Sequence, residues 1–268
     1  MSNKKILAII QARTNSTRFP NKILKKIGKL SLIEILYNRI SMSKRIDQTV
    51  VATTSSYLDD SLIKILKKNQ INYYRGSESD VLKRYYLTAK KFKADVVVRI
   101  TADCPLVDPN IVDDVINLYF KKKANYASNI DPPTYPDGLD VEVFSFNQLR
   151  IAHKQAYKKF DKEHVTPFIR NKKGIKKFNK FFKKDLSSVR LTVDEEIDLL
   201  QIKKIFKKFK NFYNFGINDI YDLFKKNKKV FDLNKKLKRN EGSKLNTGQK
   251  LWKRALEIIP DGNMLLSK

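Results

Sequence analysis

Two arginines and a lysine stand close together in a short polar segment near the start of the chain. The segment, residues 11–22, has the sequence QARTNSTRFPNK and follows an apolar run, residues 6–10, that predicts a strand. A loop of small and polar residues can turn several backbone N–H groups toward one point, and Arg13, Arg18 and Lys22 add positive charge there. This chemistry suits a polyphosphate. The ATPase loop GxxxxGK[ST] is disfavoured, because the first glycine of the chain is Gly28.

Asp103 stands just past another apolar run, residues 95–100, whose continuous hydrophobicity is typical of a strand covered on both faces. A carboxylate in this place can hold a hard divalent cation, which prefers carboxylate oxygens and bridges to substrate phosphates. The alternative is that Asp103 caps the helix entered through Pro109, but Asp108 already fits that role. We therefore favour a metal ligand at Asp103.

Further carboxylates lie far along the chain. In the segment DGLDVE, Asp140 and Glu142 are expected on one face of a strand, because alternate residues of a strand point the same way. Asp194 stands at a predicted strand-to-helix junction. It can be a plain helix cap or a second metal ligand, and its local sequence leaves both alternatives open.

The chain has two histidines, His153 and His164, and one cysteine, Cys104. These numbers exclude a histidine-rich zinc site, a cysteine-cluster metal site and a disulfide framework within the chain. His153 stands alone in a predicted helix, as surface histidines often do. His164 is the better candidate for an active-site role, because Glu163 and Arg170 are its neighbours in the segment DKEHVTPFIR.

Strand and helix patterns alternate through the first half of the chain. The predicted strands are residues 6–11, 49–53, 71–74 and 95–100, and the intervening helices begin near Ser31, Tyr57 and residues 77–80. Such a series predicts an α/β fold with a mostly parallel, doubly wound sheet. Ligands of these sheets bind beyond the carboxyl ends of the strands, and each polar loop follows a strand: residues 11–22, 53–56, 75–80 and 101–108. We expect these loops to form one site.

The second half continues with a helix after Asn110 and a strand at residues 139–144. The later elements are expected as a helical region over 147–170, strands near 176–182 and 189–191, and helices near 195–209 and 217–226. The text from Leu233 onward is rich in charge, glycine and asparagine, which predicts a flexible linker. We therefore divide the chain into an α/β domain, residues 1–232, and a tail, residues 233–268.

The net charge of +28 has two explanations. Nucleic-acid binding is one, because neutralised phosphates drive such affinity. The other, which we favour, is a set of solvated faces rich in lysine, since no helix-turn-helix, zinc finger or aromatic RNA-binding strand is found. No apolar run is long enough to span a membrane and the N-terminus lacks a signal peptide, so a soluble cytoplasmic protein is expected.

Five segments resemble motifs of the cytidylyltransferase family that includes acylneuraminate and 3-deoxy-manno-octulosonate cytidylyltransferases, above all its spore coat polysaccharide biosynthesis protein F branch. The segments are IIQARTNSTRFPNK, RITADCPLVDP, YPDGLDVEVF, EHVTPFIR and RLTVDE, in this order over residues 9–195. The resemblance implies a three-layer α/β/α fold of the nucleotide-diphosphosugar transferase type. It also implies a Mg²⁺-dependent transfer of CMP from CTP to a hydroxyl of an acidic sugar or related acceptor, with release of pyrophosphate, in surface polysaccharide biosynthesis.

The resemblance also assigns roles to residues. Nucleotide-binding residues would be Gln11, Ala12, Arg13, Ser16, Arg18, Lys22, Thr53, Thr54, Arg75, Gly76, Arg99 and Thr101. Acceptor-binding residues would be Asp137, Asp140, Glu142, Glu163, His164 and Arg170, and the Mg²⁺ ligands would be Asp103 and Asp194. Catalysis would depend on Arg13, Lys22, Asp103 and His164. The partners expected are CTP and the acceptor, and the enzyme is expected to be a homodimer.

Two positions depart from the pattern of the family. Thr14-Asn15 replaces a more pliant Met-Gly or Gly-Gly pair, and Ala102 replaces a glycine, but neither change removes a charged group. Residues 248–263 resemble the opening helix of class III pyridoxal-phosphate-dependent aminotransferases, which suggests fusion to or pairing with such an enzyme; the alternative is an amphipathic helix for dimer contact. A glycosyltransferase of similar fold, a lysine-rich nucleic-acid-binding protein and a catalytically silent interaction module remain competing functions.

Overall fold

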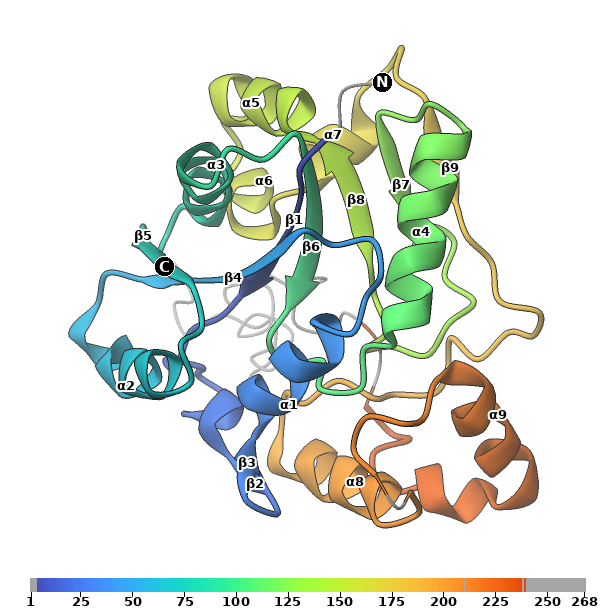
Figure 1. Ribbon diagram of the computed structural model, residues 1–268. Helices are drawn as coiled ribbons and strands as arrows, with labels where there is room; N and C mark the ends of the chain where they lie inside the picture. The colour runs from blue at the N-terminus through green and yellow to red at the C-terminus, as the bar shows by residue number, and fades with distance from the viewer. Residues whose placement is uncertain (1–3, 210, 238, 240–268) are drawn as a thin grey trace, which may run out of the picture.

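A computed structural model describes residues 4–209, 211–237 and 239 of the chain (Figure 1). The strands are β1 (Ile6–Gln11), β2 (Lys26–Ile27), β3 (Leu30–Ser31), β4 (Gln48–Thr54), β5 (Tyr73–Gly76), β6 (Val96–Thr101), β7 (Tyr126–Ser128), β8 (Glu142–Ser145) and β9 (Lys177–Asn179). The α-helices are α1 (Leu32–Ile40), α2 (Asp60–Lys68), α3 (Val81–Lys91), α4 (Pro109–Lys121), α5 (Phe146–Gln155), α6 (Lys159–His164), α7 (Pro167–Asn171), α8 (Glu196–Phe206) and α9 (Ile217–Lys226). Short 3-10 helices are η1 (Lys22–Leu24), η2 (Tyr57–Asp59) and η3 (Lys228–Phe231).

Seven strands form one sheet in the order β5-β4-β1-β6-β8-β7-β9. β5, β4, β1 and β6 are parallel, as the alternating pattern predicts, and β7 is parallel to β9. β8 is antiparallel to both of its neighbours, β6 and β7. The prediction of an α/β fold with a mostly parallel sheet is therefore confirmed, and the carboxyl ends of the parallel strands share one edge (Figure 1).

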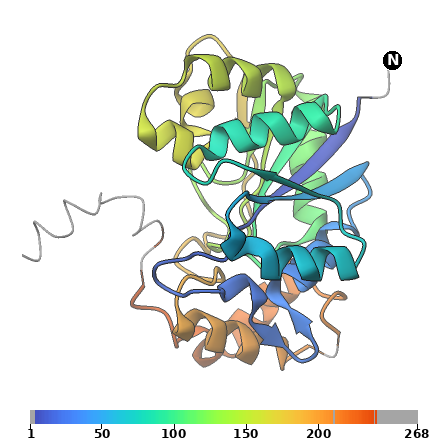
Figure 2. The ribbon, with the colours of Figure 1, turned by 90° about the vertical axis from the view of Figure 1, so that its left-hand side faces the viewer.

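Helices cover both faces of the sheet, because consecutive residues of the central strands point to opposite faces and are apolar on both. Ile6, Ala8 and Ile10 of β1 belong to a core shared with α1, α2 and α4. Leu7 and Ile9 belong to a second core shared with α3, α5 and α7. Full burial of a Leu or Ile side chain stabilises the fold by about 1.5–3 kcal/mol, so both layers contribute substantially. Figure 2 shows the two layers from the side.

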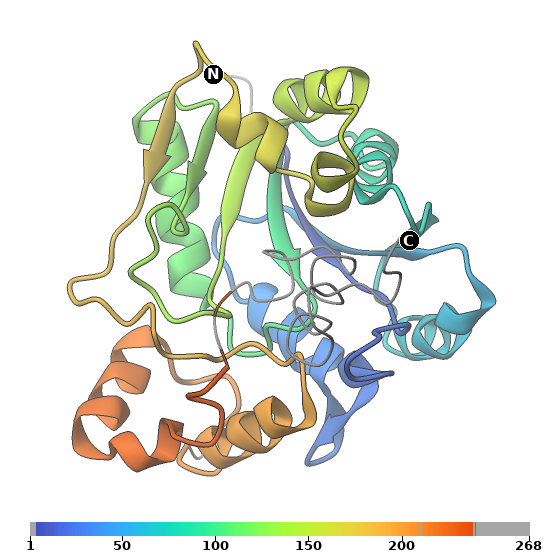
Figure 3. The ribbon, with the colours of Figure 1, turned by 180° about the vertical axis from the view of Figure 1, so that it is seen from behind.

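The last two α-helices lie at the edge of the sheet where β1 and β6 end. Figures 1, 2 and 3 show α8 and α9 in orange at this edge, with the β2–β3 hairpin in blue beside α8. Asp108 links α4 to α9: it caps α4 through the Asn110 N–H at 2.8 Å and also accepts the Ile217 N–H at 2.7 Å. A side chain at Gly216 would clash with Asp108 Oδ2, so glycine permits this close approach.

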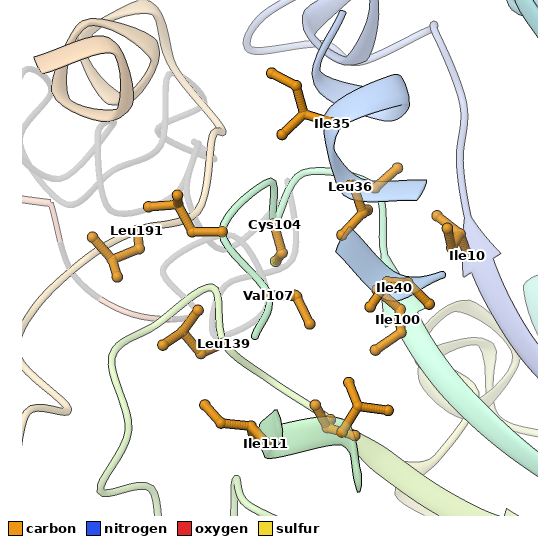
Figure 4. Close-up of a cluster of buried hydrophobic side chains, with 14 of the residues drawn as sticks. Ile10, Ile35, Leu36, Ile40, Ile100, Cys104, Val107, Ile111, Leu139 and Leu191 are labelled. Carbon is orange, nitrogen blue, oxygen red and sulfur yellow. The ribbon is translucent and has the colours of Figure 1, made fainter. Parts of the chain in front are cut away.

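A cluster of buried apolar side chains supports the loop that carries Asp103. Figure 4 shows Cys104 and Val107 of this loop among Ile10, Ile100, Leu36 and Ile40, with Leu139 and Leu191 on the other side. Each of these side chains is at most 4% exposed. The loop after β6 is therefore held in place by apolar packing on both of its sides, and this packing fixes the position of Asp103.

Some predicted elements differ from the structure. β5 begins at Tyr73 rather than residue 71, and β8 begins at Glu142 rather than residue 139. The strand predicted at 189–191 is only an isolated bridge between Asp137 and Arg190, because the Val189 and Val193 N–H groups on either side donate to Leu186 and Asp103 instead. The packing continues past residue 232, since Asn234 is buried and donates to the Arg190 carbonyl oxygen and to Asp198 Oδ1.

The aminotransferase-like segment, residues 248–263, lies outside the described residues, as does most of the predicted linker. None of the helices in the described residues is both long and apolar enough to cross a membrane.

Candidate active site at the carboxyl ends of the strands

Lys22 lies between two aspartates that come from distant parts of the chain. It is the first residue of η1 and follows Asn21, whose left-handed backbone (φ 56°) turns the end of the cationic loop, residues 11–22. Lys22 Nζ is 2.9 Å from Asp103 Oδ2 and 2.8 Å from Asp194 Oδ1. Asp103 follows β6 and Asp194 precedes α8, so both predicted metal ligands meet at one ammonium group.

The ion pair outweighs the cost of burying its charges. Burial works to raise the pKa of Asp103, but the charge of Lys22 and its hydrogen bond lower that pKa to about 2. Burial works to lower the pKa of Lys22, but the charges of Asp103 and Asp194 raise it. Lys22 and Asp103 are therefore both ionised at neutral pH.

Asp194 is held by two arginines as well as by Lys22. Arg190 Nη2 lies 2.9 Å from Asp194 Oδ2, and Arg18 Nη2 lies 2.9 Å from Asp194 Oδ1. The N-cap of α8 is Glu195, which forms a capping box with Asp198. The helix-cap alternative for Asp194 is therefore wrong, and its carboxylate faces the cationic loop.

The backbone of the cationic loop is largely bonded to the protein itself. The N–H groups of this loop that donate to protein oxygens are those of Ala12, Thr14, Ser16, Asn21 and Lys22. These five groups are not available to a phosphate, and the gathering of the other N–H groups of the loop around one stays a prediction. The loop instead presents charge through side chains: Arg13 is exposed, Arg18 reaches Asp194, and Ser16 is half-buried beside them in the sequence.

Asp103 and Asp194 are the residues best placed to hold a metal. Among the described residues, no group of three or more His, Cys, Asp or Glu side chains is arranged as a metal site. Mg²⁺, however, is usually bound by one or two carboxylates together with substrate phosphates and waters. A pair of carboxylates that already converges on a cation fits an ion that arrives with a triphosphate.

The ends of β4 and β5 carry the residues expected around the base and ribose. Thr53 and Thr54 are at most 1% exposed, and both hydroxyls donate to Asp59 Oδ2. Arg75 donates to the carbonyl oxygens of Thr54 and Ser56 and pairs with Asp60 at 2.7 Å. These side chains shape the loop after β4 through internal bonds, so their hydroxyl and guanidinium groups are already engaged.

Gly76, at the end of β5, lies against α3. A side chain there would meet the Tyr74 ring at 2.9 Å and the Arg84 side chain at 3.1 Å, so the glycine permits this contact. Arg84 is 1% exposed, donates to the Ser77 carbonyl oxygen and leaves its Nε without a partner in the described part of the chain. The nearby positive charge of Arg13 contributes to a lowered pKa of Arg84, after burial as the main cause.

A second polar group lies on the face of the sheet that α3, α5 and α7 cover. Arg99 of β6 pairs with Glu142 of β8 at 2.6 Å, and these residues are direct neighbours across the strands. Tyr126 donates to the same carboxylate at 2.6 Å. Burial works to raise the pKa of Glu142, but Arg99 and Arg170 lower it. The structure thus joins Arg99, expected at the nucleotide, to residues expected at the acceptor.

Donors without partners mark this second group. Among the described residues, the buried Nε atoms of Arg99 and Arg170 have no hydrogen-bond acceptor, and the buried Gln11 Oε1 has no donor. The His164 and Phe160 rings lie 4.5 Å apart between centroids and are tilted by 50°. Burial lowers the pKa of His164, and the charges of Arg99 and Arg170 act in the same direction against Glu163. A neutral imidazole thus lies near the two arginines whose charges also act on the buried Glu142 carboxylate.

Asp137 and Asp140 form the remaining part of the site. Arg190 Nη1 lies 3.2 Å from Asp137 Oδ2, and Arg239 donates to Asp140 and to the Tyr135 carbonyl oxygen. Burial and the charge of Asp140 raise the pKa of Asp137 to about 7. Asp140 lies before β8, so the strand geometry expected to align it with Glu142 does not apply.

The three remaining assigned residues are Ala12, Thr101 and Glu163. Ala12 is buried and its N–H donates to the Ala52 carbonyl oxygen, and the Thr101 hydroxyl lies 3.1 Å from Cys104 Sγ. Glu163 is exposed at the end of α6.

Several residues of this network were not expected from the sequence, namely Asp59, Arg84, Tyr126, Arg190 and Arg239. Arg190 stands in the RLTVDE segment, so that motif was a signal for it. Arg239 donates to Asp140, 99 residues away, so no local pattern indicates it. Figure 3 shows the segment after η3 returning toward the centre of the sheet edge.

Comparison with known proteins gives a consistent result. A family model described as cytidylyltransferase matches residues 7–245. Spore coat polysaccharide biosynthesis protein SpsF of Bacillus subtilis is 32% identical over 230 residues, which cover 83% of this chain and 95% of that protein. The 3-deoxy-manno-octulosonate cytidylyltransferase of Solibacter usitatus is 31% identical over 116 residues, 42% of this chain and 44% of the relative.

A solved structure is similar as well. The cytidylyltransferase from Leptospira borgpetersenii superposes with a TM-score of 0.82 at 31% identity, covering 85% of this chain and 97% of that one. The family match at residues 7–245 includes the cationic loop and the segments that carry Asp103 and Asp194. The chain belongs to the cytidylyltransferase family.

Proposed function

We propose that this enzyme transfers CMP from CTP to a hydroxyl group of an acidic sugar or a related acceptor and releases pyrophosphate. The observation that carries the proposal is the meeting of Lys22, Asp103 and Asp194 at the carboxyl ends of β1 and β6. In an open α/β sheet, ligands bind at this edge. Membership of the cytidylyltransferase family, together with the names of its relatives, supports the choice of CTP and of surface polysaccharide biosynthesis.

The positive charge of the cationic loop explains how the Lys22 part of the site would bind a triphosphate. The loop carries three cations, Arg13, Arg18 and Lys22. Carboxylates hold Lys22 in place, and the triphosphate would replace them as its partner. Asp103 and Asp194 would hold Mg²⁺, which neutralises phosphate charge and orients the α-phosphate when bound. Phosphoryl transfer asks mainly for positioning and electrostatic stabilisation, and a fixed lysine with fixed carboxylates provides both.

The second polar group suits the acceptor. The Nε atoms of Arg99 and Arg170, which have no acceptor among the residues that the structure describes, would meet a carboxylate of the acceptor, because buried donors without acceptors are costly. The relative named as a 3-deoxy-manno-octulosonate cytidylyltransferase supports an acidic sugar. The neutral His164, or a carboxylate of the site, would accept the proton of the attacking hydroxyl.

The reaction follows from these positions. The acceptor oxygen attacks the α-phosphorus in line, the new O–P bond forms, and the bond to the pyrophosphate oxygen breaks. Lys22 and Arg18 would stay with the departing pyrophosphate and offset its charge. The proton of the hydroxyl passes to the base on the acceptor side. Binding of both substrates at adjoining groups gives the proximity that makes this a single displacement.

A pyrophosphate-release screen tests the proposal. The purified protein is supplied with Mg²⁺ and each of the four ribonucleoside triphosphates, against a panel of acidic sugars and neutral sugars of similar size. We expect release only with CTP and an acidic sugar. Release with another nucleotide would correct the base preference, and release only with neutral sugars would refute the acceptor class.

A further inference from the structure

Asp59 has a buried carboxylate that neither helix capping nor an ion pair within the described part of the chain explains. It is 1% exposed and sits at the N-cap position of α2, yet its side chain makes no capping hydrogen bond there. Oδ1 accepts the Thr14 N–H and lies within hydrogen-bond distance of the Thr14 hydroxyl, both at 2.7 Å. Oδ2 accepts the Thr54 N–H at 3.0 Å and both threonine hydroxyls of the β4 end.

These donors come from two different segments: Thr14 stands 45 positions before Asp59, whereas Thr53 and Thr54 stand 6 and 5 positions before it. Thr14 is in the middle of the cationic loop, whereas Thr53 and Thr54 end β4. The Thr14 hydroxyl also lies 2.8 Å from the Leu58 carbonyl oxygen, so the residue is held at its amide and at its side chain. Thr14 is 3% exposed as a result.

Thr14 passes this constraint to Lys22. Its carbonyl oxygen accepts the N–H groups of Ser16 and Asn21, each at 2.9 Å, and so closes the loop onto itself. Asn21 directly precedes Lys22 and adopts the left-handed backbone that starts η1. The chain of contacts therefore runs from Asp59 through Thr14 and Asn21 to the lysine that meets Asp103 and Asp194.

We propose that Asp59 is a positioning residue of the nucleotide site, which fixes the cationic loop through Thr14 in the conformation that receives the triphosphate. The inference rests on the proposed function of that loop. Asp59 itself touches no substrate, since it is sealed beneath the loop. Thr14, which departs from the family pattern, supplies the hydroxyl of this anchor where a Gly or Met would supply none.

Asp59→Asn is the sharpest variant, because each carboxylate oxygen faces a backbone N–H that cannot turn away. Either orientation of the amide places its NH₂ group against one of these donors. Asp113→Asn is the matched control. Asp113 also ties down a loop, through the Ser43 hydroxyl and the N–H groups of Lys44 and Arg45, but it holds residues outside the site.

Two measurements on the full chain separate positioning from plain stability. Hydrogen–deuterium exchange of residues 11–22 reports the loop without any nucleotide, and calorimetric titration with CTP and Mg²⁺ reports the site. We expect Asp59→Asn to exchange faster in this loop and to bind CTP about tenfold more weakly, while Asp113→Asn matches the wild type in both. Thr14→Val keeps the hydrogen bond from the backbone N–H of residue 14 to Asp59 and removes only the hydroxyl. It should show a smaller effect of the same kind, and it serves as the test if Asp59→Asn does not fold.

Unchanged exchange in the loop, or unchanged CTP affinity in a folded variant with a loosened loop, would overturn the role of Asp59. If the wild type itself bound no CTP with Mg²⁺, the proposed function would fail. The exchange measurement would then still decide whether Asp59 fixes the loop, and a faster loop exchange in Asp59→Asn alone would support the anchor.

Discussion

The two ends of the site balance charge in different ways. At the Lys22 end, a cation is already paired with Asp103 and Asp194, and Arg18 and Arg190 pair with Asp194 as well. At the Arg99 end, one carboxylate, Glu142, faces Arg99 and Arg170, and both arginines keep a buried Nε without an acceptor in the described residues. At the Lys22 end the charged groups pair with one another, whereas at the Arg99 end two buried N–H donors have no acceptor among the described residues.

This difference indicates different kinds of ligand. At the Lys22 end, the cations and carboxylates already pair with one another. When a triphosphate and its metal bind together, the cations can pair with phosphate and the carboxylates with the metal, so the net buried charge changes little. A cluster with spare donors needs an anion of its own, and a carboxylate of the acceptor would meet that need. The predictions below separate these two ends.

The largest effect is expected at the Lys22 end. Lys22→Ala and Asp103→Ala should each lower the rate of pyrophosphate release by about tenfold to hundredfold, a loss of roughly 1.4–2.7 kcal/mol of transition-state stabilisation. Each removes one half of a fixed ion pair and leaves the other half buried. Steady-state assays with CTP and the acceptor found in the screen provide the measurement, with Asp113→Ala as control. Near-normal turnover of both site variants would remove this end from the mechanism.

The Arg99 end should respond through the acceptor alone. Arg170→Gln keeps much of the shape and removes the charge, so the KM for the acidic acceptor should rise about tenfold, roughly 1.4 kcal/mol, with the CTP affinity unchanged. Arg150, which is exposed on α5 and bonded to Asn147, gives the control variant Arg150→Gln. A loss of CTP affinity in Arg170→Gln with an unchanged acceptor KM would reverse the assignment of the two ends.

Lys22 also competes with the metal for the two aspartates. Lys22→Met should therefore tighten Mn²⁺ binding in the absence of nucleotide, by roughly threefold to tenfold, or about 0.7–1.4 kcal/mol. Electron paramagnetic resonance of free Mn²⁺ measures this without turnover. Weaker metal binding in this variant would show that Lys22 supports the metal site rather than competing for it.

The pH profile tests the proton acceptor. Because burial and the nearby arginines lower the pKa of His164, its neutral form is present at pH 7 and is lost only below the ordinary histidine pKa of about 6.5. If His164 is the base, kcat/KM for the acceptor falls with acid only below that pH, and His164→Gln abolishes this acid limb. An unchanged profile in His164→Gln would assign the proton to a carboxylate.

Local signals in the sequence were sufficient for much of the fold. β1 occupies the predicted residues, and the capping box of Ser31 and Glu34 begins α1 as expected, because both depend on neighbours in the chain. The parallel order of the first strands follows from the alternation of elements and the rule for right-handed crossovers. The loops that meet at one edge of the sheet were therefore predictable.

The polar network was less predictable because its partners are distant. Asp59 stands near Tyr57, where a helix was expected to begin, but its hydrogen bonds go to Thr14, Thr53 and Thr54. Arg99 was assigned to the nucleotide from its motif, but strand register sets it opposite Glu142. Sequence spacing indicates the types of group in a site, whereas partner choice depends on how strands and loops pack.

Calorimetric titration of CTP with and without Mg²⁺, in the wild type and in Asp103→Asn and Asp194→Asn, tests the central claim most directly. If the two aspartates hold the metal beside the cationic loop, Mg²⁺ strengthens CTP binding at least about tenfold in the wild type and has little effect in either variant. An equal gain from Mg²⁺ in all three proteins would contradict the account.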